Sequence, residues 1–215
     1  MLSVIIPAYN EEKYLEKTLD NLYYHAPPSL NVVVVSDGST DKTEKVALQY
    51  PVDFVQLRRR RGPAAAKNTG ARVAKGDIFV FLDADTLVSD SVLKKIEKEC
   101  IDHIGGSCHI IPDSLRWKHR FFYSLKNPLC KIFGISNGIF FCTRKTFYDH
   151  SGFPDGVGED GYLLRRIKRK GKFLFLDETV TSSVRRFEKE GYLSSLWYWS
   201  KVRMKKPSAL YGAVR

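Results

Sequence analysis

The sequence predicts an α/β fold with a mostly parallel central sheet flanked by helices, and three observations lead to this prediction. The short apolar runs Leu2–Ile6, Val32–Val35 and Ile78–Leu82 are rich in β-branched or aromatic residues, as in strands buried on both faces. The segments between them carry apolar residues at helical spacing. A chain of 215 residues with 43% hydrophobic residues is long enough to bury one full core.

The first elements form a β-α-β unit. A helix is expected after Leu2–Ile6, with Asn10 as its cap and with Glu11 and Glu12 at the positive end of the helix dipole. The apolar face of this helix comprises Leu15, Leu19, Leu22 and Tyr23. The strand at Val32–Val35 completes the unit.

The same alternation continues along the first half. A helix is expected from Thr40 onward and a strand over Val52–Leu57. Pro63 suits the first position of a helix over residues 64–74, because proline there forfeits no useful donor. Gly76 ends that helix before the next strand. Alternating strands and helices imply right-handed connections and a mostly parallel sheet.

The pattern is looser in the second half of the chain. Ser89 is assigned as the cap of a helix that runs through Cys100. A short basic helix is expected over Leu163–Lys170, followed by a strand over Phe173–Leu176. No internal repeat or long linker divides the chain. We therefore expect one domain over residues 1–215, with a nucleotide-binding half (1–100), an acceptor half (101–190) and an aromatic and basic segment (191–215).

Composition narrows the class of protein. The four cysteines form no Cys-x-x-Cys pair, so buried or inert thiols are expected rather than a zinc site or a disulfide framework. No apolar run approaches the roughly 20 residues needed to cross a bilayer, and the first residues lack the basic leader of a signal peptide, so a cytoplasmic location is expected. The net charge of +11 calls for an anionic partner, such as a nucleotide sugar, a lipid phosphate, an anionic membrane or a nucleic acid.

Asp83, Ala84 and Asp85 directly follow the apolar run Ile78–Leu82. Open α/β sheets bind their ligands at the ends of such strands. Magnesium or manganese is usually held there by one or two carboxylates together with substrate phosphates. An isolated Asp-x-Asp is weak evidence, because it also recurs in surface turns. The blocks around it make the indication stronger.

Five further blocks occur in a fixed order around this tripeptide. They are SVIIPAYNEE at 3–12, VVVVSDGSTD at 32–41, GPAAAKN at 62–68, NGIF at 137–140 and GED at 158–160. In this order the sequence resembles the family 2 glycosyltransferases up to about Arg186. The resemblance implies the GT-A fold, a Rossmann-like nucleotide-diphospho-sugar transferase fold, and an inverting transferase that depends on a nucleotide sugar.

The resemblance also implies a nucleotide site at the strand ends. Pro7, Ala8 and Tyr9 follow the first strand, where the Tyr9 ring is placed to stack on the base or to pack at the sheet edge. Glu11 resembles the acid that reaches the ribose or base, although dipole complementarity explains it almost as well. Asp37 resembles the residue that contacts the base, or it makes a tight turn and caps the next helix. Relatives usually carry a second acid at the position of Ser36. Its absence here makes the preference for uridine over guanosine less firmly indicated.

The family pattern assigns the phosphates and the metal to three residues. Lys67 stands where relatives carry arginine, so it would supply a point charge to phosphate but no bidentate fork. Asp85 would bind manganese or magnesium directly, and Asp83 would touch the ribose or a metal-bound water. The metal would take up charge as the nucleoside diphosphate leaves.

The block at 158–160 implies the catalytic base. Asp160 would take a proton from the acceptor hydroxyl, on the face opposite the leaving group, and Glu159 would orient it. The competing interpretation is an ordinary set of surface ion pairs with the basic helix that follows.

Other blocks imply contacts to the sugar and the diphosphate. Asn137 and Gly138 resemble the segment that lines the donor sugar pocket, although a turn before a strand explains them equally well. Arg185 and Arg186 resemble a basic pair near the diphosphate, with a solvated charge pair as the alternative. Beyond them, aromatic and basic residues suit either a peripheral membrane contact or core packing. They are Tyr192, Trp197, Tyr198, Trp199, Lys201, Arg203, Lys205 and Lys206.

We therefore expect a metal-dependent glycosyltransferase of the hexosyltransferase type. Its donor would be a nucleoside diphosphate sugar, with UDP favoured. Its acceptor would be a glycan hydroxyl or a polyprenyl-phosphate lipid. The protein would lie at the inner face of the membrane if the last segment binds lipid. A nucleic-acid-binding protein is the first alternative, but no nucleic-acid-binding signature is present and unscreened acids would repel phosphate. A sugar-phosphate nucleotidyltransferase is the second, but Pro7-Ala8-Tyr9-Asn10 is not a glycine-rich phosphate loop.

Overall fold

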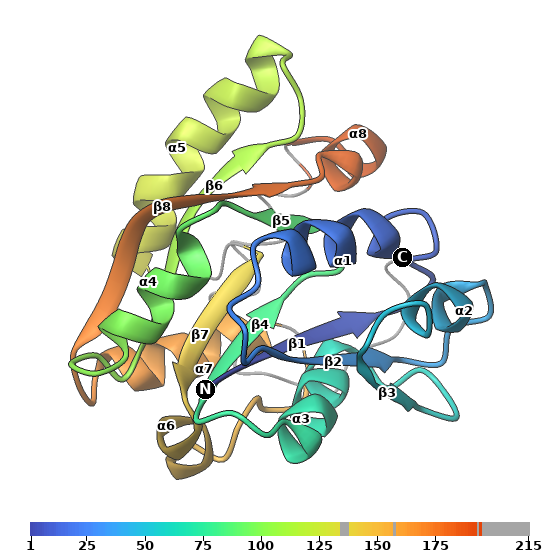
Figure 1. Ribbon diagram of the computed structural model, residues 1–215. Helices are drawn as coiled ribbons and strands as arrows, with labels where there is room; N and C mark the ends of the chain where they lie inside the picture. Colours follow the sequence, from blue (N-terminus) through green and yellow to red (C-terminus); the bar gives the residue numbers. More distant parts are fainter. Residues whose placement is uncertain (134–137, 157, 193, 195–215) are drawn as a thin grey trace.

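The computed structural model describes residues 1–133, 138–156, 158–192 and 194 and shows an α/β fold with helices on both faces of one sheet (Figure 1). Within these residues the sheet has eight strands in the order β3-β2-β1-β4-β7-β6-β8-β5. The strands are β1 (Leu2–Ala8), β2 (Asn31–Ser36), β3 (Asp53–Gln56), β4 (Ile78–Leu82), β5 (Thr86–Val88), β6 (Gly105–Pro112), β7 (Ile139–Thr143) and β8 (Phe173–Ser182). The helices are α1 (Leu15–Tyr24), α2 (Thr43–Ala47), α3 (Pro63–Val73), α4 (Val92–Glu99), α5 (Trp117–Phe133), α6 (Arg144–Asp149), α7 (Glu159–Lys168) and α8 (Arg185–Glu190).

The sheet is parallel where the sequence alternates strands and helices. β3, β2, β1 and β4 run parallel to one another. Beyond β4 the sheet becomes mixed, because β7 runs antiparallel to both β4 and β6, and β5 runs antiparallel to β8. β6 and β8 are parallel. Four of the seven pairings are thus parallel, and the prediction of a mostly parallel sheet is confirmed.

Two apolar layers sandwich the sheet, one on each face. Side chains of successive strand residues point to opposite faces, so Val4 and Ile6 pack into one layer and Ile5 into the other. The first layer includes the buried faces of α1 and α4, and the second those of α3 and α7. Burial on both faces explains why β1, β2 and β4 appear as continuous apolar runs.

Two predicted helix caps are wrong. α1 begins at Leu15, and Asn10 instead has a positive φ of 56° and accepts a hydrogen bond from the backbone N–H of Thr40 at 2.8 Å. Because β1 and β2 pair in parallel, the loop after β2, which contains Thr40, lies beside Asn10. A pattern within one segment could not reveal this contact. α4 begins after Ser91, and Ser89 contributes its carbonyl oxygen to the N–H of Val92.

Two helix assignments also differ from the prediction. α7 begins at Glu159, so the two acids form its first turn instead of preceding it. Their negative charge suits that position. α5, a helix of 17 residues, was not predicted, because it carries apolar residues on more than one side and Pro128 within it.

The cysteines agree with the expectation. Cys108, Cys130 and Cys142 are buried, Cys100 is half-buried, and all four are free thiols. Burial raises the pKa of the Cys100 thiol to about 12, with the nearby charge of Glu99 adding to the effect. In the part of the chain that the structure describes, no helix is long and apolar enough to cross a membrane.

Packing of α3 on the sheet requires a residue without a side chain at Gly70. A Cβ atom there would lie 2.4 Å from Cγ2 of Ile5 and 3.2 Å from Cγ2 of Val35. Gly70→Ala should therefore lower the free energy of unfolding by about 1–3 kcal/mol, as overpacking does in tight cores. Urea denaturation measures this loss. Val73→Ala, at an exposed position of the same helix, is the control and should stay within about 0.5 kcal/mol. Equal stability of Gly70→Ala and the wild type would contradict this close packing.

Candidate active site

The predicted site residues converge at one edge of the sheet. β1, β2 and β4 are parallel, so the residues that follow Ala8, Ser36 and Leu82 all emerge there. The Asp83 turn is held from two sides. The backbone N–H of Asp83 donates to the carbonyl oxygen of Gly138 at 2.9 Å, and the Thr18 hydroxyl donates to the Ala84 carbonyl at 2.8 Å.

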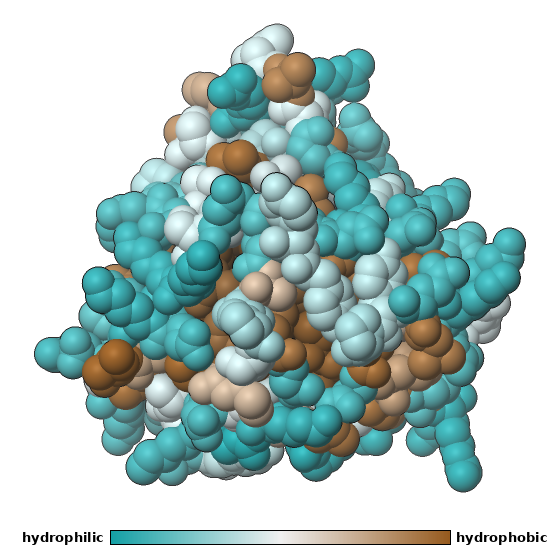
Figure 2. Space-filling model, viewed as in Figure 1, coloured by the Kyte–Doolittle hydropathy of each residue, from teal (hydrophilic) through white to brown (hydrophobic). Residues whose placement is uncertain are grey.

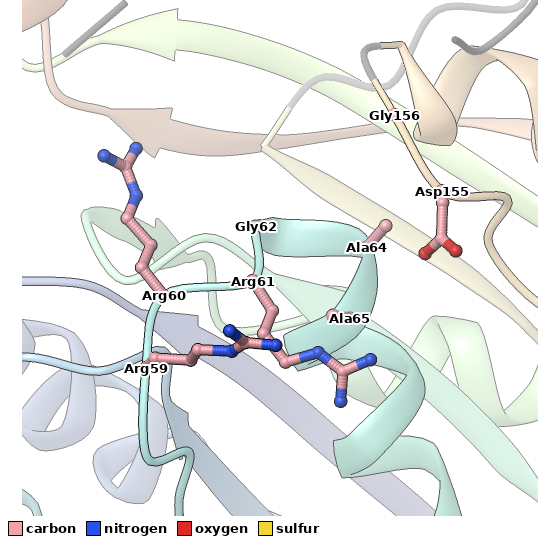
Figure 3. Close-up of a pocket in the computed structure, with 8 residues that line it drawn as sticks. All are labelled: Arg59, Arg60, Arg61, Gly62, Ala64, Ala65, Asp155 and Gly156. Atoms are coloured by element: carbon pink, nitrogen blue, oxygen red, sulfur yellow. The ribbon is translucent and has the colours of Figure 1, made fainter. Parts of the chain in front are cut away.

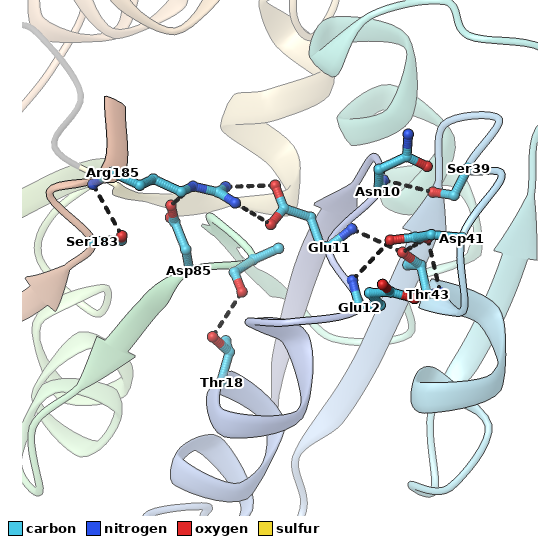
Figure 4. A network of polar contacts seen from close by, with 11 residues as sticks. Asn10, Glu11, Glu12, Thr18, Ser39, Asp41, Thr43, Asp85, Ser183 and Arg185 are labelled. Carbon is cyan, nitrogen blue, oxygen red and sulfur yellow. Dashed lines mark hydrogen bonds and ion pairs between the residues drawn. The ribbon is translucent and has the colours of Figure 1, made fainter. Parts of the chain in front are cut away.

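One cation joins two of the acids, and we call Glu11, Asp85 and Arg185 the Arg185 cluster (Figure 4). The guanidinium of Arg185 binds both carboxylate oxygens of Glu11, at 2.6 and 2.7 Å. Its Nε lies 2.8 Å from Oδ2 of Asp85, and it stacks over the ring of Tyr14 at 4.3 Å. The Glu11 side chain is only 7% exposed, so this charge pairing is largely shielded from water.

Burial and ion pairing act against each other in this cluster. Burial raises the pKa of Asp85, Arg185 opposes that rise, and the charge of Glu11 adds to it. Burial alone would lower the pKa of Arg185, but Glu11 and Asp85 outweigh it and raise that pKa. The guanidinium therefore remains charged beside Asp85.

A second buried cation binds the two acids of α7, and we call Lys67, Glu159 and Asp160 the Lys67 cluster. Lys67 Nζ lies 2.5 Å from Oδ1 of Asp160 and 3.4 Å from Oε1 of Glu159. Its ammonium group also lies over the Phe153 ring, 5.1 Å from the centroid. The side chains of Lys67 and Glu159 are 5% and 7% exposed, whereas that of Asp160 is 26% exposed. Asp160 is thus the member of the cluster most open to an incoming molecule.

The Lys67 cluster also shifts the pKa of its members. Burial alone would lower the pKa of Lys67, but Asp160, Glu159 and the more distant Asp83 outweigh it and raise that pKa. Burial raises the pKa of Glu159 to about 7, the charge of Asp160 adds to the rise, and Lys67 opposes it.

Asp83 links the two clusters electrostatically. The dense protein surroundings raise its pKa to about 6; Lys67 opposes this rise, and Asp85 and Asp160 add to it. The Asp83 side chain is nevertheless exposed to solvent. Arg186 of α8 also lowers the pKa of Asp83, so its charge lies close to the same carboxylate. Acids from both halves of the chain therefore share one electrostatic neighbourhood.

Asp37 has a structural function that the sequence pattern did not indicate. Its two carboxylate oxygens accept the backbone N–H groups of Arg61 and Gly62, at 2.7 and 2.8 Å, and the residue is 4% exposed. Burial raises its pKa, while these two donors lower it. Asp37 thereby fixes the loop that leads into α3.

A cationic cavity opens beside that loop (Figure 3). It has a volume of about 350 Å³, and three arginines, the start of α3 and the segment before α7 line it. The lining residues are Arg59, Arg60, Arg61, Gly62, Ala64, Ala65, Asp155 and Gly156. Arg60 also stacks on the ring of Tyr9 at 4.3 Å, so one face of that ring is covered by a guanidinium. The acids of the two clusters do not line this cavity, which adjoins the loop fixed by Asp37.

Two of the predicted site residues make contacts that the sequence did not predict. Lys67 contacts the acids of α7 rather than facing an open site, and Glu11 pairs with Arg185. Both contacts join residues far apart in sequence, which single-sequence patterns do not report. Gly138 lies against the Asp83 turn. Pro7 and Ala8 are the last two residues of β1. Asn137 lies outside the described residues.

Most of the aromatic and basic segment also lies outside the described residues, including Trp197, Tyr198, Trp199, Lys201, Arg203, Lys205 and Lys206. Tyr192 is described, and its ring stacks on Phe187 at 5.4 Å and lies 4.7 Å from that of Phe122. Of the two uses considered for this segment, Tyr192 shows packing.

Comparison with known proteins identifies a family. The sequence pattern of the family described as "Glycosyl transferase family 2" matches residues 3–167, which is most of the chain. A solved mannosyltransferase from Pyrobaculum calidifontis, in complex with GDP-Man and Mn²⁺, is 27% identical and has a TM-score of 0.72. That match covers 96% of this chain and 65% of the other. The predicted GT-A fold is confirmed.

Two curated relatives each match a little under half of the chain's length. A dolichol-phosphate mannosyltransferase from Pyrococcus furiosus is 36% identical over 101 residues, which is 44% of this chain and 28% of the relative. A dolichyl-phosphate beta-glucosyltransferase from Mus musculus is 34% identical over 116 residues, which is 47% of this chain and 36% of the relative. The chain spans about a third of the length of the curated relatives it matches.

The raised pKa of Glu159 predicts a pH dependence of stability. Glu159 ionises more readily in the unfolded chain, at an ordinary pKa of 4.5, than in the folded protein, at about 7. Its contribution to stability is therefore fully present below about pH 4.5 and is lost as the pH rises through 7. Relative to the wild type, Glu159→Gln should gain on the order of 1–3 kcal/mol between these two pH values.

Chemical denaturation at a series of pH values measures this difference. The control is Glu190→Gln, which removes an exposed carboxylate of α8 and should show no such pH-dependent gain. A constant difference between Glu159→Gln and the wild type across this range would refute the raised pKa.

Proposed function

Because the chain belongs to glycosyltransferase family 2, we propose that it transfers one sugar, with inversion, from a nucleoside diphosphate donor to a hydroxyl or lipid-linked phosphate acceptor. The observation that carries this proposal is the meeting of two sets of acids at one edge of the sheet. Asp83 and Asp85 come from the end of β4, and Asp160 comes from the first turn of α7. Transfer requires these two functions, one for the leaving diphosphate and one for the acceptor.

The residues at this edge fit a divalent cation that is shared with substrate phosphates. Asp85 and Glu11 already bracket a cationic group, the guanidinium of Arg185, and Asp83 presents an open carboxylate beside them. Among the described residues no group of three or more His, Cys, Asp or Glu side chains could hold a metal alone. This is consistent with magnesium or manganese held by one or two carboxylates plus phosphate oxygens. When bound, the cation would neutralise the charge that develops on the leaving diphosphate.

Arg185 would change partners as the donor binds. Its Nε bond to Asp85 uses the carboxylate that we assign to the metal, so Asp85 must be released from Arg185 for that role. The same guanidinium, with Arg186 beside it, would then be free to donate two parallel hydrogen bonds to phosphate oxygens. Arg185 would thus compensate the acids before the donor arrives and the diphosphate afterwards.

Asp160 is proposed as the base that receives the acceptor proton. Lys67 fixes one carboxylate oxygen at 2.5 Å, and the partial exposure of Asp160 leaves the group accessible to an acceptor. Glu159 lies deeper and neutralises part of the Lys67 charge. A hydroxyl acceptor needs this proton transfer, whereas an ionised phosphate acceptor has no proton to lose. The importance of Asp160 therefore depends on the acceptor.

The comparisons support a range of donors and acceptors. The Pyrobaculum protein holds GDP-Man and Mn²⁺, and the names of the two curated relatives refer to dolichyl or dolichol phosphate. We propose a UDP-sugar for this chain because Asp37 follows β2, where it would meet the imide of uracil. Its bonds to Arg61 and Gly62 occupy one lone pair of each oxygen and limit this contact. The cationic cavity beside the loop provides further positive charge for a nucleotide.

Removal of Asp85 should weaken metal binding. Asp85→Asn should lower manganese affinity roughly a hundredfold in the presence of UDP, because a direct ligand loses its charge. Calorimetric titration of manganese with UDP or GDP present measures the affinity and identifies the preferred base. Asp102→Asn, an exposed acid elsewhere, is the control and should bind like the wild type. Unchanged manganese affinity in Asp85→Asn would remove this residue from the metal site.

Loss of the carboxylate of Asp160 should affect turnover rather than donor binding. With a hydroxyl acceptor, Asp160→Asn should lower kcat by about 10²–10⁴-fold, as expected for loss of a general base. Its Kd for the nucleotide should remain within about threefold, since Asp160 is not assigned to the donor. Single-turnover sugar transfer and nucleotide titration separate the two effects. Asp102→Asn changes an exposed acid outside the site and should remain active. An active Asp160→Asn with a hydroxyl acceptor would identify a different base.

A further inference from the structure

The outward side of α5 carries an unusual set of exposed apolar side chains. The described residues include 13 exposed large hydrophobic residues, and six of them lie between positions 115 and 132. They are Leu115, Trp117, Phe121, Leu125, Leu129 and Ile132, with exposed fractions of 90, 78, 58, 52, 44 and 65%. We call these six residues the α5 stripe. Scattered exposed hydrophobic residues are normal, but a contiguous group marks a surface that meets another apolar phase.

Helical geometry places the stripe opposite the packed face of α5. At about 100° per residue, the five stripe residues within the helix fall in an arc of roughly 120°. The packed face, which includes Tyr123 and Cys130, lies on the other side. There the Asn127 side chain bonds the backbone N–H and carbonyl of Ile110 in β6, at 3.0 and 2.9 Å. Packing on β6 thus explains one apolar face of α5 but not the stripe.

The position of α5 leaves this side accessible. In Figure 1 the helix lies at the periphery of the fold, beyond β6 and β8. In Figure 2 apolar atoms appear among hydrophilic ones at the apex that α5 forms in the same view.

The charges that α5 and the residues just before it carry all have one sign, and Glu188 of α8 pairs with one of them, Arg116, at 3.5 Å. Residues 114–133 contain five cations and no aspartate or glutamate. The cations are Arg116, Lys118, Arg120, Lys126 and Lys131, all of which are exposed except the half-buried Lys126. Long cationic side chains beside an apolar stripe that contains tryptophan are typical of helices that lie in the interface of an anionic bilayer. The chain's net charge of +11 acts in the same direction.

We propose that α5 docks on the surface of an anionic lipid bilayer, with the α5 stripe in the boundary between headgroups and acyl chains and the exposed cations, which exclude Lys126, on lipid phosphates. This surface differs from the segment at 191–215, which suggested membrane contact in the sequence. The proposal does not depend on sugar transfer, because it rests only on the exposure, spacing and charge of α5.

The helix connects this surface to the candidate active site. Lys126 lies on α5 at the side of the stripe, and burial lowers its pKa while the charge of Asp83 opposes that shift. The ammonium group of Lys126 therefore lies near the carboxylate that links the two clusters. Docking through α5 would place the membrane close to that edge of the sheet, where an acceptor with a lipid-linked phosphate would arrive.

Flotation with lipid vesicles tests the docking. The wild type should bind vesicles of phosphatidylcholine and phosphatidylglycerol in roughly a two-to-one ratio, bind pure phosphatidylcholine more weakly, and dissociate as salt is raised. Phe121→Ser/Leu125→Ser should bind the anionic vesicles at least about tenfold more weakly, since two apolar side chains are lost from the interface. The matched control is Tyr24→Ser/Leu48→Ser, which removes one exposed aromatic and one exposed leucine elsewhere and should bind like the wild type.

Fluorescence gives a second measurement that does not require the stripe to be altered. In a Trp197→Phe/Trp199→Phe background Trp117 is the only tryptophan. Brominated lipid in anionic vesicles should then quench its emission. Circular dichroism and UDP binding should be the same in all variants, which separates loss of docking from loss of the fold or of the proposed donor site.

Three results would overturn the proposal. These are no binding of the wild type to anionic vesicles, equal binding of the stripe variant and the wild type, and absence of Trp117 quenching. If instead sedimentation showed a dimer that Phe121→Ser/Leu125→Ser dissociates, with no vesicle binding, the stripe would be an interface between copies of the chain, and the bilayer assignment would be wrong.

Discussion

The compensation of buried negative charge by two cations organises the carboxyl edge of this sheet. An isolated buried carboxylate is costly, and a cation within contact distance lowers that cost. Lys67 satisfies Glu159 and Asp160, and Arg185 satisfies Glu11 and Asp85. Each cation touches two acids, so each cluster retains a net negative charge of about one unit when both of its acids are ionised. That residual negative charge would attract the divalent cation that accompanies a diphosphate.

The two clusters also connect distant parts of the chain. Arg185 lies 174 residues from Glu11, and Lys67 lies 93 residues from Asp160. Arg185 thereby holds the start of α8 against the end of β1, and Lys67 holds the start of α7 against α3. The contacts that compensate charge therefore also assemble the site from both halves of the sequence. A lysine at position 67 suits this role, because a compact ammonium can lie between two carboxylates as a point charge.

Arg185 and Asp37 each combine a structural function that is observed with a ligand contact that is proposed. Arg185 compensates the acids in the structure and is proposed to meet the diphosphate, and Asp37 fixes the loop before α3 while it is proposed to meet the base. Such double use explains why the simple alternatives raised by the sequence, a turn, a dipole or an ion pair, were difficult to separate from a catalytic function. The ion pairs are present, and they lie at the edge where the fold binds ligands.

The sequence by itself determined the α/β class, the parallel half of the sheet and the position of Asp83 and Asp85 at a strand end. Those features depend on local patterns, namely continuous apolar runs, helical spacing and the residues that follow a strand. It missed α5, because apolar residues on two sides of a helix blur the usual periodicity, and it misplaced the caps at Asn10 and Ser89. Only the tertiary structure decided that Lys67 contacts Asp160, that Arg185 contacts Glu11 and Asp85, and that β7 runs antiparallel to β4. These features depend on contacts between residues distant in sequence, and the energy of such contacts is not encoded in any one segment.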